Sequence, residues 1–196
     1  FPTRRSSDLI ENVSVNLSGQ SEFTWSSSPN TGYYIIYIKD NNGAWITLDT
    51  VPSSQNTYVY QSSQAASYIE TFSVRAIDSC GNSRIQALEH NSILLTNTSN
   101  ACDYSISLDW NDYINWVGGT HHYIVLISET DTNGNVINTT IRVQGNSELF
   151  LESISSFSSY GIVVEAYNND STFKAVSNII DLNIAILKSS RLLKNL

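Results

Sequence analysis

The sequence predicts an all-β protein built as two tandem β-sandwiches, and three observations lead to that fold class. First, the 196-residue chain is rich in Ser, Asn, Thr, Ile, Val and Tyr, a balance that favours strands over helices. Second, short strand-like runs alternate with turn signals, including Asn-Gly pairs at 42–43 and 133–134 that are typical of tight hairpins. Third, the two halves repeat each other at a period of about 90 residues, the size of one small sandwich domain.

The strand-like segments come in two similar series. In the first half they are residues 12–17, 22–27, 33–39, 44–51, 57–61, 70–78 and 91–96. In the second half they are residues 104–110, 122–128, 136–143, 147–153, 160–167 and 176–183. Several short strands at this spacing, joined by polar turns, are typical of sandwich domains.

The repeat also identifies the expected core. "EFTWSSS" matches "SISLDWN", which aligns Trp25 with Trp110, and the tyrosine-led segments that follow align Tyr34 with Tyr123. Alternation along each strand places these side chains on the inward face, so each half should have its own core. A buried Trp or Tyr also needs a hydrogen-bond partner for its polar tip.

The predicted domains are residues 10–93 and 94–184. The boundary stretch "HNSILLTNTSN" is strand-like and contains no Gly or Pro linker, so the last strand of one domain should lead directly into the next. A tether that short limits the angles between the domains. Residues 185–196 are basic and Leu-rich, and they form either a short helix or the first strand of a further module.

Charge and motifs exclude several classes of function. A net charge of −8 repels phosphate backbones, so nucleic acid is not an expected partner. No apolar run is long enough for insertion in a membrane. Adjacent residues on a strand point to opposite faces, so His121 and His122 do not chelate one metal ion together. No Gly-x-Ser-x-Gly or phosphate-binding glycine motif is present. The sequence therefore predicts no catalytic residue, no metal site, no cofactor and no enzyme.

The second half carries the residues of a known family. Its second strand contains Trp110, its third strand begins at Tyr123, and its sixth strand reads Tyr160, Ile162, Val164, Ala166 at alternate positions. This pattern resembles a fibronectin type III domain, an immunoglobulin-like sandwich. The resemblance implies that Tyr160 forms the tyrosine corner of that fold. In the first half Glu70 stands at the corner position, with Tyr68 near enough to substitute.

A narrower resemblance rests on the ordered motifs "DSCGN", "HNSI", "AC" and "YINW". They are similar to tandem modules in large surface proteins of gliding bacteria, which carry a gliding-motility-associated C-terminal sorting domain and leave the cell by type IX secretion. The resemblance implies an extracellular or cell-surface location and a spacer or adhesive role. Its implied partners are neighbouring modules of the same chain, with a glycan or a surface protein as a further ligand. The alternatives are an accessory module of a secreted carbohydrate-active enzyme and a ligand-binding ectodomain with a pocket shared between its domains.

Two cysteines, Cys80 and Cys102, allow one intramolecular pairing. In an exported protein a disulfide is expected, and it would close a loop of about 20 residues worth roughly 3 kcal/mol. The alternative is two free thiols, because the two positions belong to different domains.

The loop "YINWVGG" is the candidate contact loop. Tyr113 and Trp116 either project from the sandwich to stack on a sugar or a partner, or fold back over its edge and become buried.

The first nine residues, "FPTRRSSDL", differ in composition from the rest of the chain. They resemble the translated read-through of a common sequencing adapter, so residues 1–9 are expected to be a non-native scar on a fragment of a longer protein. A native basic lead-in is the alternative.

Overall fold

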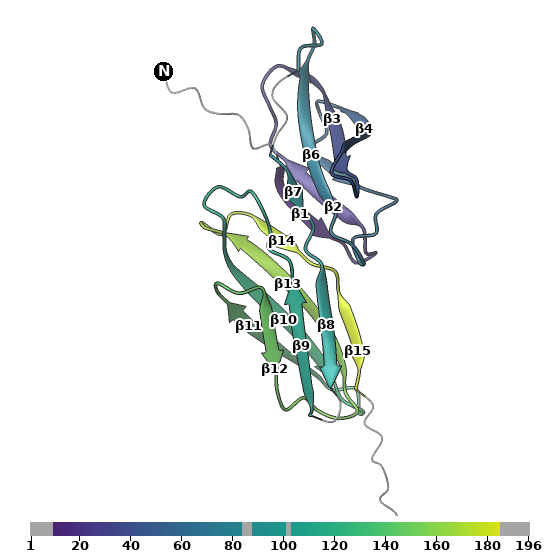
Figure 1. Ribbon diagram of the computed structural model, residues 1–196, viewed down its shortest axis with the longest axis vertical. Coiled ribbons are helices and arrows are strands. Elements are labelled where there is room, and N and C mark those ends of the chain that lie inside the picture. The colour runs from purple at the N-terminus through teal and green to yellow at the C-terminus, as the bar shows by residue number, and fades with distance from the viewer. Residues whose placement is uncertain (1–9, 84–87, 101–102, 185–196) are drawn as a thin grey trace, which may run out of the picture.

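The computed structural model describes residues 10–83, 88–100 and 103–184 and places two β-sandwiches end to end (Figure 1). The two sandwiches are called domain 1, up to residue 93, and domain 2, from residue 94. Each consists of a three-stranded sheet packed on a larger sheet, and every strand pairing in them is antiparallel. The predicted all-β fold class is therefore confirmed.

Domain 1 contains seven described strands. One sheet has the order β1 (Ile10–Val15), β2 (Ser21–Trp25), β5 (Thr57–Val59), and the other has the order β4 (Trp45–Pro52), β3 (Thr31–Lys39), β6 (Thr71–Asp78), β7 (His90–Asn91).

Domain 2 repeats this arrangement. Its smaller sheet has the order β12 (Glu148–Leu151), β9 (Ser105–Trp110), β8 (Leu95–Asn100). Its larger sheet has the order β11 (Val136–Val143), β10 (Thr120–Thr130), β13 (Ser159–Asn168), β14 (Lys174–Val176), and β15 (Ile180–Asn183) also pairs with β13. In both domains the first, second and fifth strands face the third, fourth, sixth and last strands. This is the fibronectin type III-like strand order.

The structure divides two segments that the sequence predicts as single strands. The segment 91–96 ends one domain as β7 and starts the next as β8, and the segment 176–183 falls between β14 and β15. Between β14 and β15, the side chain of Asn178 makes hydrogen bonds to the backbone of Leu95. The Asn178 amide accepts a hydrogen bond from the Leu95 N–H at 2.7 Å and donates one to the Leu95 carbonyl at 3.1 Å. Because a side chain satisfies both groups, the backbone ladder is interrupted there.

The two cores contain the same ring pair at the same place. Trp25 contacts Tyr34 edge to face at 5.6 Å between ring centroids, and Trp110 contacts Tyr123 in the same way at 5.4 Å. All four side chains are buried. The Tyr34 hydroxyl accepts a hydrogen bond from the Ser28 N–H at 2.9 Å.

The polar tips of the two core tryptophans differ from the expectation. Within the described residues, neither the Trp25 nor the Trp110 indole N–H has a hydrogen-bond partner. Each lies among apolar side chains and the tyrosine ring, so ring packing offsets the unmade bond, which typically costs about 1–3 kcal/mol.

Aspartates begin the hairpin turns. The Asp131 carboxylate accepts hydrogen bonds from the Asn133 and Asn135 N–H groups at 2.8 and 2.9 Å, and Gly134 takes a φ of 82° that few other residues adopt. Asp40 binds its own turn in the same way. These side chains accept hydrogen bonds from backbone N–H groups of the turns, which explains why polar residues recur between the strands.

Candidate functional site: the interdomain junction

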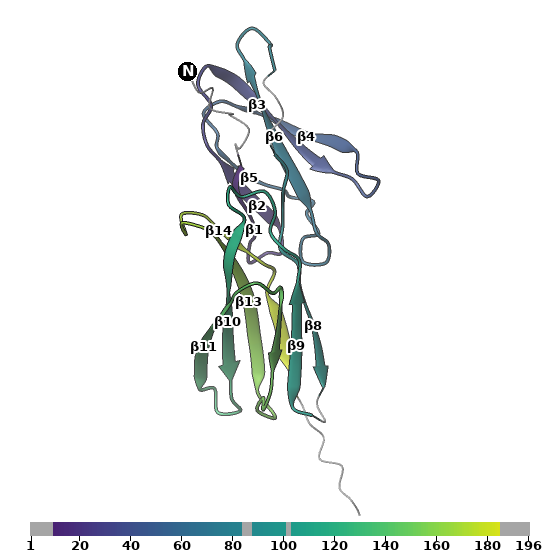
Figure 2. The same cartoon turned by 60° about the vertical axis from the view of Figure 1, so that its left-hand side comes forward.

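The junction is formed where a loop of domain 2 packs against domain 1. Residues 111–119 join β9 to β10 and lie beside β1 of the first sandwich (Figure 2). They also bond to Asn91 of β7. Tyr113 and Trp116 are only 4% and 6% exposed, and their ring centroids lie 3.9 Å apart. The structure therefore buries both residues of the predicted contact loop, and it buries them against the neighbouring domain.

Both aromatic side chains also make polar bonds to domain 1. The Tyr113 hydroxyl accepts a hydrogen bond from the Val13 N–H at 2.9 Å and lies 3.0 Å from His90 Nδ1. The Trp116 indole N–H donates to the Glu11 carbonyl at 2.7 Å. Each ring thus contributes apolar burial and a directional bond to one strand, β1.

Asparagine side chains join the rest of the junction. Asn91 of domain 1 accepts from the Ile114 N–H and donates to the Asp112 carbonyl, each at 2.9 Å. Asn111 of domain 2 accepts from the Leu94 N–H at 2.7 Å and donates to the Ser92 carbonyl at 3.1 Å. An amide side chain carries both a donor and an acceptor, so each of these residues pairs two backbone groups at once.

The edge strand β1 is covered by β14. The Asn12 side chain donates to the Lys174 carbonyl at 2.8 Å, and the Val176 N–H donates to Ser14 Oγ at 3.1 Å. Figure 1 shows β14 reaching the level of β1 at the top of domain 2. An uncovered edge strand invites pairing with other chains, so this contact also protects domain 1.

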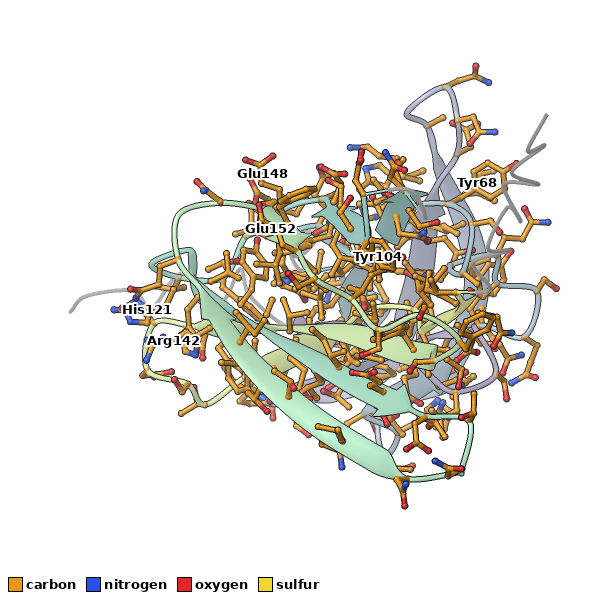
Figure 3. The ribbon with its side chains drawn as sticks, turned by 90° about the horizontal axis from the view of Figure 1, so that it is seen from below. Tyr68, Tyr104, His121, Arg142, Glu148 and Glu152 are labelled. Carbon is orange, nitrogen blue, oxygen red and sulfur yellow. The ribbon has the colours of Figure 1, made fainter. Side chains whose placement is uncertain are left out.

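The corner positions of the two domains use different chemistry. In domain 2 the Tyr160 hydroxyl accepts a hydrogen bond from the Ser155 N–H at 2.8 Å, which is the expected tyrosine corner. In domain 1 the buried Glu70 carboxylate takes the place of the tyrosine hydroxyl and accepts a hydrogen bond from the Gln64 N–H at 2.7 Å. Tyr68 does not substitute for it: its side chain is 63% exposed and stands at the surface in Figure 3.

Beside the buried loop, a groove of about 450 Å³ opens between the domains. It is lined by the start of β1, by the end of the 111–119 loop and by the turn between β13 and β14. The lining residues are Ile10, Glu11, Ser26, Trp116, Val117, Asn168, Asn169, Asp170 and Phe173. Hydrogen bonds from the Thr172 hydroxyl and backbone N–H hold the pKa of Asp170 below its usual value, so this carboxyl is ionised.

The histidine pair lies apart from the groove, at the start of β10. His122 stacks on Tyr167 at 5.0 Å, whereas His121 is exposed on the side where Figure 3 also places Arg142. Burial, followed by the positive charge of Arg142, lowers the pKa of His122. Over residues 10–83, 88–100 and 103–184, no three His, Cys, Asp or Glu side chains gather to hold a metal ion.

The predicted disulfide remains a prediction. Cys80 is exposed in the turn after β6, and its only possible partner, Cys102, lies outside the described residues. The predicted segments 1–9 and 185–196 also lie outside them.

Sequence reasoning missed the polar half of the junction. It identified Tyr113 and Trp116 but not the asparagines at 12, 91 and 111 or the strand that receives them. Asparagine is so common here, and so typical of turns, that its presence carried no signal. Asn91 lies inside a strand-like segment at the domain boundary, but Asn138 and Asn178 lie inside strand-like segments too, so its position did not set it apart.

Neither a protein-family model nor a curated protein matches the chain. Among solved structures, it is similar to the FN1–FN3 domains of chicken CNTN1, with 16% identity and a TM-score of 0.36 over 92% of this chain and 64% of that one. It is also similar to the chicken interferon gamma receptor alpha chain, with 12% identity and a TM-score of 0.35 over 92% of this chain and 100% of that one. The chain thus spans less than two thirds of the CNTN1 fragment. The strand order, rather than these distant alignments, carries the fibronectin type III-like assignment.

A search of the described residues for a helix long and apolar enough to cross a bilayer finds none.

Proposed function

We propose that this chain is a non-enzymatic tandem module of a larger bacterial cell-surface protein, where it holds its neighbours at a fixed angle and distance outside the cell. The resemblance to surface modules of gliding bacteria supports export by type IX secretion and an extracellular location. Fibronectin type III-like domains fit such a tandem role.

The observation that carries the proposal is the bonded junction. Bending the two domains apart would expose Tyr113 and Trp116, and fully burying two such side chains is worth about 3–6 kcal/mol. Bending would also break the bonds of Asn91 to the 111–119 loop, and hydrogen bonds weaken steeply when their angle opens. A spacer needs this resistance, because a joint that bends freely absorbs extension.

Residual dipolar couplings test the proposal. A rigid pair of domains aligns with one tensor, whereas independent domains give two tensors of different magnitude. We expect one tensor for the native protein and two for the double variant Asn91→Ala, Trp116→Ala. The matched control is Asn138→Ala on β11, an exposed asparagine far from the junction. Two tensors in the native protein would refute the rigid-spacer role, and unchanged amide spectra of each variant's cores would show that both domains remain folded.

A further inference from the structure

The groove between the domains brings together, from both sandwiches, two carboxylates, an amide side chain and an exposed phenylalanine ring. We propose that it binds a neutral saccharide, which lies against Phe173, donates hydrogen bonds to the carboxylates of Glu11 and Asp170, and exchanges hydrogen bonds with the Asn169 amide. The proposal goes beyond the spacer role and assigns a ligand class to a cavity that both domains share.

Contacts between the two domains fix the walls of the groove. Its volume of about 450 Å³ lies within the range of about 300–1,000 Å³ that small-molecule sites occupy. Two of its walls belong to different domains, and the Trp116–Glu11 and Asn12–Lys174 bonds hold those walls together. A site that needs no rearrangement saves the cost of ordering its loops on binding.

Its polar groups remain available to a ligand. The Asn169 side chain makes no hydrogen bond within the described residues, and it lies close above Gly118, where an added Cβ would be 3.5 Å from the Asn169 Cβ. The bonds that Asp170 receives from Asn168 and Thr172 all go to Oδ1. This leaves Oδ2 free to accept. Within the described residues, the Glu11 carboxylate receives one long contact, at 3.4 Å, from Thr24 Oγ1.

Apolar side chains flank these groups. Phe173 and Val117 line the groove and are 36% and 82% exposed, and the edge of Trp116 forms part of the wall. A saccharide complements both kinds of group in the groove. Its C–H faces pack on apolar and aromatic side chains, and its hydroxyls donate and accept hydrogen bonds.

Charge selects among saccharides. Among the described residues, two carboxylates line the groove and no Lys or Arg does, so this lining repels a uronate or a sulfated sugar. A metal ion is disfavoured as the ligand because the described lining supplies only two carboxylates. The Asn169 amide both donates and accepts, so it pairs best with a ligand that carries donors as well as acceptors.

Saturation-transfer NMR and calorimetry with a defined panel test the assignment. The neutral probes are cellotriose, mannotriose, xylotriose and maltotriose, and the charged probes are trigalacturonate and tetramethylammonium. We expect at least one neutral trisaccharide to bind with a dissociation constant on the order of 1 mM. Asn169→Ala should weaken that binding roughly tenfold, because it removes one group that hydrogen-bonds the ligand. Phe173→Ala should weaken it comparably.

Matched controls keep the result specific. Asn138→Ala and Phe150→Ala remove an exposed asparagine and an exposed phenylalanine elsewhere in domain 2 and should leave the affinity unchanged. Asn169 is exposed, so its variant should fold normally, which amide spectra would show. The proposal is overturned if no neutral probe binds at about 10 mM, if Asn169→Ala binds as well as the native protein, or if either charged probe binds in preference.

Discussion

The carboxylate that replaces the tyrosine corner of domain 1 gives the sharpest prediction for stability. Glu70 is 8% exposed and its two oxygens serve three donors. Oε2 accepts from Ser21 Oγ at 2.7 Å and from Ser63 Oγ at 2.6 Å, and Oε1 accepts from the Gln64 N–H at 2.7 Å. The side chain thus connects the start of β2 with the loop that precedes β6.

Replacing Glu70 by alanine should destabilise domain 1 by about 3–4 kcal/mol. A hydrogen bond to a charged group is worth about 1.5–3 kcal/mol, and the loss is less than the sum of three because water enters the space and the serines rotate. Glu70→Gln should lower the free energy of unfolding by about half as much. The glutamine keeps one acceptor oxygen, but its NH₂ group replaces the other carboxylate oxygen, which accepts hydrogen bonds in the native protein.

Urea unfolding followed by tryptophan fluorescence measures the change in the free energy of unfolding. Native-state amide exchange then locates it, because the added exchange should fall on β2 and β6 rather than on domain 2. The control is Glu22→Ala, an exposed glutamate on β2 that should change stability by less than about 0.5 kcal/mol. The reasoning is refuted if Glu70→Ala costs under about 1 kcal/mol, or if Glu70→Gln is as stable as the native protein.

Two further predictions concern ionisation and the thiols. Burial, followed by the Glu165 carboxylate that accepts its hydroxyl at 2.7 Å, raises the pKa of Tyr167 to about 12. Because this folded value lies above the ordinary value of 10.0, the stabilisation is full below pH 10 and is lost as the pH rises toward 12. Phenolate absorbance should therefore show a late step that Tyr167→Phe removes, and superimposable titrations of the two proteins would contradict this. If Cys80 and Cys102 are bonded, the intact mass without reductant is two hydrogens lower and alkylation requires reduction; rapid alkylation of both thiols in the folded protein would exclude the disulfide.

Local pattern was enough to predict most of the fold. Alternation along the strands and the duplication place Trp25 and Trp110 at equivalent inward positions, and the structure buries both beside a tyrosine. The sequence predicts two separate cores, whereas the buried residues of the two sandwiches form one continuous cluster through the junction. Asn-Gly turns marked the hairpins because a positive φ at glycine is a local requirement. These signals depend only on neighbours in sequence, so they are readable without the fold.

The corner and the junction depend on residues far apart in the chain. Glu70 was visible as a departure from tyrosine, but its role required Ser21, which lies 49 residues away. Asn12 meets Lys174 at a separation of 162 residues. No periodicity connects such partners, and a buried glutamate looks like a surface one until the donors around it are known.

The length of the loop between the second and third strands of each domain determines which contacts it makes. The two domains share strand order, core ring pairs and hairpin turns, yet residues 27–32 of domain 1 are short where residues 111–120 of domain 2 are long. The extra length carries Tyr113 and Trp116 across to β1, and it also supplies one wall of the groove. In the shorter loop the Ser28 N–H bonds Tyr34 of its own domain. The longer loop therefore gives domain 2 a set of contacts with its neighbour that the shorter loop does not make, on two sandwiches that share one strand order.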